Sequence, residues 1–447
     1  MPSPDTRGPG GGGAELFPLP VPHNSFAPHI SHLSRKVRSR VNRSLHVHDR
    51  ARNSVIALNE LYGVPAKSGV VASAAQCSAL EHIYSCHSSC IPPSDICKPD
   101  VALSELLRCR PGYSDDVSNL APYDSLLLSV PDGSQAVVPL VGLLETNDAN
   151  VLSGESGGLL RTPDSYDSLI NSVGKAKPYM CPCLRDRKNY LSFLRSLVRG
   201  GMLVFSRKKK ASVTPFFVEK KGKGTIRLIL DAREANQYFV DPTNPHMGSG
   251  SALANLVVPV GEDMYWATSD LKDAFYGMGI PEWLSAYFAL PCLSASEVRS
   301  LGGIVGDVPQ TTRFYPCLCV LPMGWSWSVY LCQRCHENIL LREGLVNSAR
   351  KLVDFTTAPD LSCGSPVWLG YVDNSVIGGT DKAQVDALRT VCDDAFRKAG
   401  LRVHEETFAA RNLDTLGIGI DDLCVLRPKT KRLWKYYQAL TCGLEGR

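Results

Sequence analysis

Two acidic segments, far apart in the chain, have the residue types of a metal-binding catalytic pair. The stretch WLGYVDNSVIGG, residues 368–379, has two apolar arms around a polar tip at Asp373 and Asn374, a pattern that predicts a β-hairpin. Asp270 follows the strand-like run MYWATS and precedes LKDAF, so we expect it where a strand runs into a helix. Two carboxylates on adjacent strands of one sheet can share a pair of Mg²⁺ ions, which prefer oxygen ligands. Taken singly, each aspartate is better explained as a cap or turn residue.

Three further segments are expected to form the elements that position this pair. The segment RDRKNYLSFLRSLVRGGML is predicted to be a helix that ends at Gly200–Gly201, with its apolar face formed by Tyr190, Phe193, Leu194 and Leu197. Residues 214–239 predict a hairpin with arms PFFVEK and TIRLILD around a turn at Gly222–Gly224. Positive charge gathers near that turn at Lys220, Lys221, Lys223 and Arg227. Residues 321–340, LPMGWSWSVYLCQRCHENIL, predict a glycine turn that leads into a helix.

The first part of the chain is less informative. Residues 1–33 are rich in Gly and Pro and are expected to be disordered, whereas residues 34–52 are basic. This basic run is either a nucleic-acid arm or nuclear address, or a solvated helix or tail. Residues 124–144 resemble two strands around a Pro-Asp-Gly turn. A zinc site is conceivable in the cluster His82, Cys86, His87, Cys90 and Cys97, although the spacing fits no ligand pattern well.

Composition limits the class of protein and its surroundings. The 447 residues suffice for two or three domains, and 44% of them are hydrophobic, so most of the chain can bury a core. The net charge is only +4, and nucleic-acid binding therefore has to be argued from local basic runs. Neither an apolar signal segment nor a membrane-spanning apolar run is present in the sequence. We expect an intracellular protein, nuclear or cytoplasmic, that has no membrane partner and keeps its 16 cysteines mostly reduced.

One cysteine motif has two possible interpretations, haem attachment and core packing. CQRCH, from Cys332 to His336, matches the pattern of c-type haem attachment. It falls inside the helix predicted after the Leu-Pro-Met-Gly turn, where small apolar thiols suit a core. We therefore interpret both cysteines of the motif as core residues and expect no haem.

The order of the segments resembles the reverse transcriptase family of retroelements. The matching motifs are RLILDAREAN, SDLKDAF, LPMGWSWSVYLCQ, YVDN and LDTLGIGI, in that order and at suitable distances over roughly residues 185–425. The resemblance implies an α+β fold with an antiparallel palm sheet backed by helices and a fingers subdomain before it. It also implies template-directed nucleotidyl transfer with two Mg²⁺ ions, or Mn²⁺, and primer–template nucleic acid and deoxynucleoside triphosphates as partners.

The resemblance assigns roles to individual residues. Asp270 and Asp373 match the metal-binding aspartates, Asn374 takes the place of the next catalytic aspartate, and the backbone carbonyl of Leu271 completes the metal site. Other positions match nucleotide-binding residues of the family. Lys220 (or Lys221) and Arg227 match the residues that clamp the triphosphate, and Asp273 and Ala274 match those whose backbone amides lie beneath it. Phe275 matches the steric gate, and Met323 and Gly324 match residues near the incoming sugar and the template base. Without the motif order, Phe275 and Met323 would be interpreted as core residues, and Lys220 and Arg227 as a solvated face.

The sequence also departs from the family pattern. Asn374 replaces the second aspartate of the hairpin, so the site loses a negative charge, and we expect weaker Mg²⁺ binding or a preference for Mn²⁺. Thr407 stands where relatives carry a lysine, with His404 as the nearest titratable substitute, and Val329 replaces a common proline. The chain ends soon after LGIGI, which leaves little for a thumb subdomain.

These observations give a domain plan and two functional hypotheses. The plan has residues 1–52 disordered and basic towards the end, 53–183 of unknown function, 184–425 as fingers and palm, and 426–447 as a short C-terminal segment. The first hypothesis is an RNA-directed DNA polymerase of retroelement origin. The alternative is a catalytically impaired, domesticated or truncated pseudo-polymerase that binds nucleic acid. Template preference and oligomeric state stay open at this point.

Overall fold

The computed structural model divides the chain into two compact units, Met1–Leu106 with Thr430–Arg447, and Leu107–Lys429. The residues that it describes are 16–23, 34–63, 71–89, 98, 100–102, 120–154, 158–220, 224–422, 424–429, 433–436 and 438. Most of the segment predicted to be disordered, the turn residues 221–223, and Cys90 and Cys97 of the proposed zinc cluster lie outside these ranges. None of the helices within the described ranges has both the length and the apolar composition to span a membrane.

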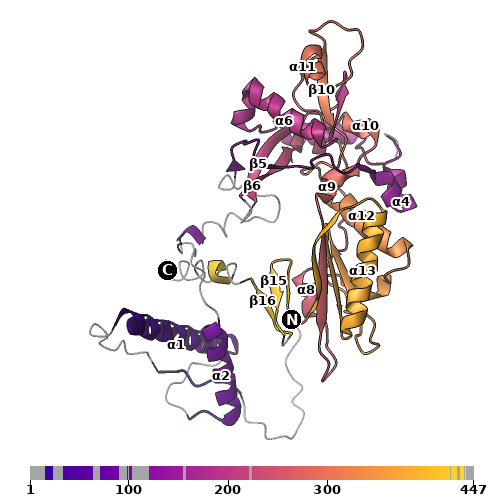
Figure 1. Cartoon of the computed structure of the whole chain (residues 1–447). Coiled ribbons are helices and arrows are strands. Elements are labelled where there is room, and N and C mark those ends of the chain that lie inside the picture. The colour runs from indigo at the N-terminus through magenta and orange to yellow at the C-terminus, as the bar shows by residue number, and fades with distance from the viewer. Residues whose placement is uncertain are drawn as a thin grey trace. The chain divides into compact units, whose positions relative to one another are not determined.

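Among its described residues, the first unit includes helices α1 (Arg35–Leu61) and α2 (Ala74–Ser89) (Figure 1). The basic run 34–52, for which helix and tail were both open, lies almost wholly in α1, and its charged first turns are exposed. The small core of this unit includes Leu19 and Val55. The side chain of Asn59 accepts from the Leu19 amide and donates to the Leu19 carbonyl, at 2.7 and 2.8 Å.

The second unit is built around a four-stranded antiparallel sheet. Its strands, in the order β11-β12-β7-β13, are Val367–Tyr371, Asn374–Gly379, Tyr265–Leu271 and Val403–Ala410. The hairpin predicted at residues 368–379 is therefore confirmed, as is the strand that places Asp270 near its end. The alternation of side chains along a strand sends Trp266 and Ala267 to opposite faces, and each face has its own core.

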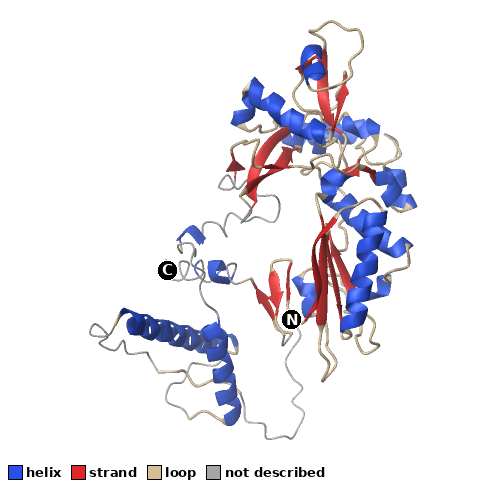
Figure 2. Ribbon diagram, viewed as in Figure 1, coloured by secondary structure: helices blue, strands red, loops and turns tan. Residues whose placement is uncertain are grey.

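Helices cover one face of this sheet, and a short helix with a small sheet covers the other. Helices α12 (Ser328–Arg342) and α13 (Lys382–Lys398) lie along one face, where Phe396 and Ile377 share a core (Figure 2). On the other face, Leu253 and Trp266 share a core with residues of β14 and β15. The elements on that side are α8 (Gly250–Ala254), β14 (Leu413–Thr415), β15 (Ile418–Ile420) and β16 (Leu426–Pro428).

A second four-stranded sheet contains the predicted basic hairpin. Its strands, in the order β1-β5-β6-β2, are Leu120–Ala121, Thr214–Lys220, Thr225–Asp231 and Leu128–Ser129. Strands β5 and β6 pair antiparallel, which confirms the hairpin. Helix α6 (Arg187–Arg199) covers this sheet with Tyr190, Phe193, Leu194 and Leu197 buried, the apolar face that the spacing predicted. The ring centroids of Phe193 and Phe217 are 5.7 Å apart.

The two strands predicted within residues 124–144 exist, but they do not pair with each other. Strand β2 runs parallel to β6, and β3 (Val138–Pro139) runs parallel to β8 (Met278–Gly279). The intervening turn is pressed against the end of α6, where an added Cβ at Gly133 would collide with the carbonyl oxygen of Arg199. The turn therefore packs against α6, and its two arms pair with different strands.

The remaining elements connect these layers. They are η2 (Leu140–Leu143), α4 (Thr146–Val151), α5 (Pro163–Val173), η3 (Pro182–Arg185), β4 (Leu203–Ser206), α7 (Arg233–Asn236), α9 (Ala274–Gly277), α10 (Glu282–Ser285), β9 (Leu293–Ser294), α11 (Ala295–Ser300), β10 (Arg313–Leu318) and η4 (Ser348–Arg350). Strands β4, β10 and β9 form a three-stranded sheet. The chain therefore has a mixed helix-and-sheet fold.

Candidate active site

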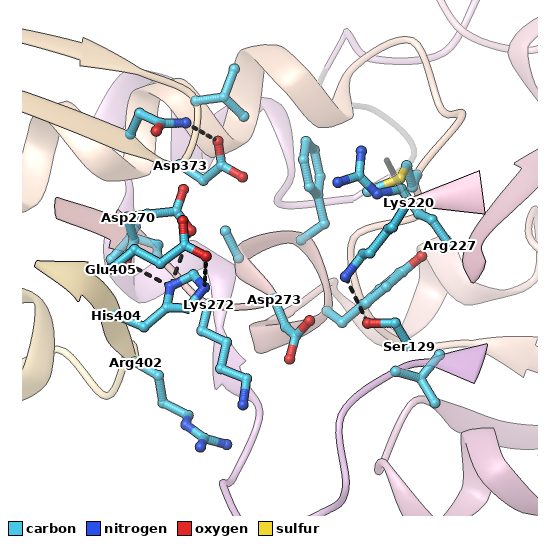
Figure 3. Close-up of a pocket in the computed structure, with 18 of the residues that line it drawn as sticks. Ser129, Lys220, Arg227, Asp270, Lys272, Asp273, Asp373, Arg402, His404 and Glu405 are labelled. Atoms are coloured by element: carbon cyan, nitrogen blue, oxygen red, sulfur yellow. Dashed lines mark hydrogen bonds and ion pairs between the residues drawn. The ribbon is translucent and has the colours of Figure 1, made fainter. Parts of the chain in front are cut away.

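The register of the central sheet brings the two predicted aspartates together. Tyr371 pairs with Asn374 across the hairpin, and Asn374 lies opposite Asp270 on β7. The Leu271 amide donates to the carbonyl oxygen of Asp373 at 2.8 Å, which fastens the hairpin tip to the end of β7. Figure 3 shows the carboxylates of Asp270 and Asp373 near each other at this tip.

A cavity of about 1070 Å³ opens at this tip. Its lining includes all the predicted site residues except Gly324, namely Lys220, Arg227, Asp270, Leu271, Asp273, Ala274, Phe275, Met323, Asp373 and Asn374. The alternative cation Lys221 lies outside the described residues. Segments from β5, β6, β7, α9 and the β11–β12 hairpin thus converge on one cavity that has acidic residues on one wall and basic residues on another (Figure 3).

Gly324 lies next to the cavity lining and shapes it through the backbone. Its φ is +126°, and an added Cβ would collide with the carbonyl oxygen of Leu230 on β6. The Leu230 amide also donates to the carbonyl oxygen of Met323 at 2.9 Å. The close approach expected of this glycine is therefore an approach to the β5–β6 hairpin, and it joins the turn before α12 to that hairpin.

Burial and hydrogen bonding act in opposite directions on Asp373. Burial raises the pKa of its carboxyl group. The Asn374 side chain, which donates from Nδ2 to Oδ1 of Asp373 at 2.9 Å, lowers the pKa, as do the charges of Arg227 and His404. The net effect is a raised pKa, so the described surroundings leave the charge of this carboxylate incompletely balanced. A bound cation would favour its charged form.

His404 contacts the other aspartate. His404 and Asp270 are paired on β13 and β7, and His404 Nδ1 lies 3.1 Å from Asp270 Oδ2 and 3.2 Å from the Asp270 carbonyl oxygen. Thr407 instead pairs with Thr268, is exposed, and does not line the cavity. Of the two positions considered for the family lysine, only His404 reaches the site.

Several lining residues were missed by the sequence analysis. They are Ser129, Asp132, Lys272, Tyr371, Arg402 and Glu405. Ser129 on β2 accepts a 2.6 Å hydrogen bond from Lys220 Nζ, and Arg402 donates to Ser134 at 3.3 Å. Lys272 and Arg402 could have been noted as basic residues close to strand ends. Ser129 could not, because the pairing of β2 with β6 joins segments far apart in the sequence.

The two cysteines of the CQRCH motif are core residues, whereas the described part of the His/Cys cluster in the first unit is partly exposed. Cys332 and Cys335 are buried on α12, and burial raises the pKa of both thiols, as suits core residues. In the first unit, His82 Nε2 lies 3.7 Å from Cys86 Sγ. Across the described ranges, no group of three or more His, Cys, Asp or Glu side chains is placed to hold a metal ion. The acidic pair at the cavity thus supplies two carboxylates, with Asn374 beside them.

Comparison with known proteins finds one family match and similar solved structures. Residues 218–420 match the family model described as reverse transcriptase (RNA-dependent DNA polymerase). Among solved structures, the chain is similar to a foamy viral protease–reverse transcriptase in complex with double-stranded DNA, at 15% identity and a TM-score of 0.38, covering 61% of this chain and 38% of that one. It is also similar to a prototype foamy virus protease–reverse transcriptase mutant, at 18% identity and a TM-score of 0.36, covering 57% and 27%. The chain thus spans well under half the length of either. No curated protein matches the chain.

Proposed function

Because residues 218–420 belong to the reverse transcriptase family, we propose that the chain is an RNA-directed DNA polymerase of retroelement origin. It would add deoxynucleotides to the 3′-hydroxyl of a primer paired to a template. The observation that carries the proposal is the placement of Asp270, on β7, beside Asp373, in the β11–β12 turn, at one wall of a cavity that Lys220 and Arg227 also line. In this proposal the β11-β12-β7-β13 sheet is the palm and the β5–β6 hairpin belongs to the fingers.

The donor atoms at the acidic wall suit Mg²⁺. Asp270, Asp373 and the backbone carbonyl of Leu271 offer oxygen ligands only, and the raised pKa of Asp373 indicates a charge that a cation would balance. Mg²⁺ is commonly held by one or two carboxylates together with substrate phosphates, so two carboxylates suffice. When bound, such ions help to deprotonate the primer hydroxyl and neutralise the leaving pyrophosphate. Mn²⁺ is the alternative ion, because Asn374 supplies no third negative charge and Mg²⁺ binding is therefore expected to be weaker.

The other walls of the cavity would hold the nucleotide. Arg227 and Lys220 can donate to triphosphate oxygens, and Ser129 already fixes the direction of the Lys220 ammonium. Asp273 precedes α9 with a left-handed φ of 53°, and its side chain makes no capping hydrogen bond to that helix. The backbone amides of Asp273 and Ala274 would lie beneath the triphosphate. Phe275 lines the cavity, where its ring would exclude a ribose 2′-hydroxyl.

The domain boundaries remain part of the proposal. Residues 184–425 would be the fingers and palm, residues 53–183 have no assigned function, and residues 426–447 would follow the palm. The compact unit itself begins at Leu107, and strands β1 and β2 join the sheet of the β5–β6 hairpin. Residues before 184 therefore also contribute to the cavity walls, among them Ser129 and Asp132.

A second candidate function is nucleic-acid binding without turnover. Asn374 favours it, because its amide occupies one oxygen of Asp373 and removes a charge from the metal site. The basic wall of the cavity would be retained in such a protein.

Primer extension on an RNA template separates the two candidates. The purified full chain would be compared with Asp373→Ala and Asn374→Asp in Mg²⁺ and in Mn²⁺, with template binding measured by gel shift. The polymerase proposal predicts extension by the wild-type chain that Asp373→Ala abolishes while binding persists. Binding without extension in all three proteins would leave the second candidate.

A further inference from the structure

The basic run of residues 34–52 concentrates the positive charge of the chain. It contains seven Lys or Arg residues and one Asp, a net charge of +6, whereas the whole chain carries +4. The rest of the chain is therefore slightly acidic. No Asp or Glu occurs between Glu15 and Asp49. A chain whose proposed partner is a polyanion thus has its main cationic segment in the first unit, whereas the cavity belongs to the second.

This charge lies on the first half of α1. The cations of that half are all exposed, namely Arg35, Lys36, Arg38, Arg40 and Arg43. Lys36, Arg40 and Arg43 are spaced i, i+4 and i+7, so they follow one side of the helix. Within the described part of the chain, none of the five is in an ion pair. Their charges are therefore available to a partner.

The second half of α1 holds the helix in its unit. Ala51 and Val55 are buried, and Ser54 Oγ lies 2.8 Å from His87 Nε2 on α2. Arg50 Nη2 donates to the carbonyl oxygen of His87 at 3.2 Å. The cationic first half is thus presented to solvent by a helix that is fixed at its other end.

The arrangement of the cations works against the helix that carries them. Cations in the first turn oppose the helix dipole, which favours negative charge there, and that turn has no acidic residue. Arg40 also lies at i, i+4 from Lys36 and at i, i+3 from Arg43, spacings at which like charges repel. A bound polyanion would relieve both effects.

The surface suits phosphates better than a membrane. Four of its five cations are arginines, whose guanidinium groups can donate two hydrogen bonds to one phosphate. From Lys36 to Arg43 the helix rises about 10 Å, a length over which a duplex presents about six phosphate charges. A helix that lies in a membrane surface needs a broad apolar face, whereas Val37 is the one exposed large apolar side chain in residues 35–48.

We propose that the first half of α1 is a second nucleic-acid-binding surface, which contacts the phosphates of RNA or DNA without reading their sequence. It would add its affinity to that of the cavity and keep the template bound while nucleotides are added. This use as a tether rests on the proposed function, whereas the binding itself is measured without catalysis.

The test compares the full wild-type chain with the triple variant Lys36→Gln, Arg40→Gln and Arg43→Gln. Gln is a good helix former, so α1 should persist, and thermal unfolding checks that it does. The double variant Arg40→Lys and Arg43→Lys keeps the charge and serves as the conservative variant.

Helix α6 offers a matched control for the loss of charge. Lys188, Arg195 and Arg199 are three exposed cations on that helix, and the control variant replaces all three by Gln. Fluorescence anisotropy would measure binding to a single-stranded RNA and to a DNA duplex over about 50 to 200 mM salt. Vesicles that contain phosphatidylserine provide the membrane arm of the test.

We expect the α1 triple variant to bind nucleic acid at least about tenfold more weakly, with a slope of log K against log salt that is shallower by about 2 to 3, because about three phosphate contacts are lost. The conservative variant and the α6 control should keep the wild-type slope. A loss with RNA alone, or with DNA alone, supports the proposal and shows which nucleic acid the surface holds.

An unchanged slope in the α1 triple variant, or an equal loss in the α6 control, would overturn the proposal. Weaker binding to the vesicles with unaltered binding to RNA and DNA would overturn it as well, because the surface would then be a membrane site. If the wild type extends no primer while the α1 triple variant shows the expected loss, the surface stands and the polymerase proposal fails.

Discussion

Replacing Asn374 by aspartate should have opposite effects without and with a divalent ion. In the metal-free protein, Asn374→Asp removes the 2.9 Å hydrogen bond to Asp373 and puts a third carboxylate beside two others. Two like charges about 4 Å apart repel by about 4 kcal/mol at an effective dielectric constant of about 20. Burial already raises the pKa of Asp373, so the pair can take up a proton before the full repulsion develops. We therefore expect a loss of about 2 kcal/mol in the free energy of unfolding.

With Mg²⁺ or Mn²⁺ present, the added charge should stabilise the variant. A third carboxylate at the ion increases its attraction, and a ligand that binds only the folded state raises stability with concentration. We expect the half-saturating Mg²⁺ concentration to fall about tenfold and the metal-induced rise in Tm to exceed that of the wild type.

Thermal unfolding in a chelator and across a Mg²⁺ series measures both effects. Asn374→Ser is the matched control, because it removes the amide without adding charge. The reasoning is refuted if Asn374→Asp is as stable as Asn374→Ser in the chelator, or if Mg²⁺ raises the Tm of all three proteins equally.

Three other predictions follow from single residues. Gly324→Ala should lower the free energy of unfolding by about 3 kcal/mol in denaturant titrations, because its positive φ and its contact with Leu230 exclude a Cβ, whereas Gly306→Ala, with nothing within 4 Å, should be near neutral. Equal effects would contradict the backbone contact. Burial lowers the pKa of His336 from 6.5 to about 4. As pH drops from 6.5 to 4, the unfolded chain therefore binds a proton before the folded one does, and the free energy of unfolding should fall by up to about 3 kcal/mol. The denaturant midpoint of His336→Asn should vary less over that range, and parallel profiles would disprove this. Phe275→Ala should raise ribonucleotide incorporation relative to deoxynucleotide by at least about tenfold in primer extension, and an unchanged ratio would remove its role as a gate.

The elements that could be predicted from the sequence are those that local patterns determine. The hairpin of residues 368–379 has apolar arms around a polar tip, and the apolar spacing of α6 places Tyr190 and Leu197 on one face. Asp270 was expected at a strand end because the alternation of MYWATS stops there. In each case, neighbours within a few residues decide the structure.

The features that were missed depend on pairings between distant segments. Strands β2 and β3 each pair with a strand far along the chain. The turn residues around Gly133 predict where the chain turns, but they do not show which strand each arm pairs with. His404 contacts Asp270 only because of the register between β13 and β7.

The most direct test of the account is whether Asp270 and Asp373 form one metal site. Mn²⁺ binding would be titrated by electron paramagnetic resonance for the wild type, Asp270→Asn, Asp373→Asn and the double variant. Because a shared site needs both carboxylates, we predict that each single variant loses nearly as much affinity as the double variant. Independent, additive losses, or single variants that bind as the wild type does, would contradict the account.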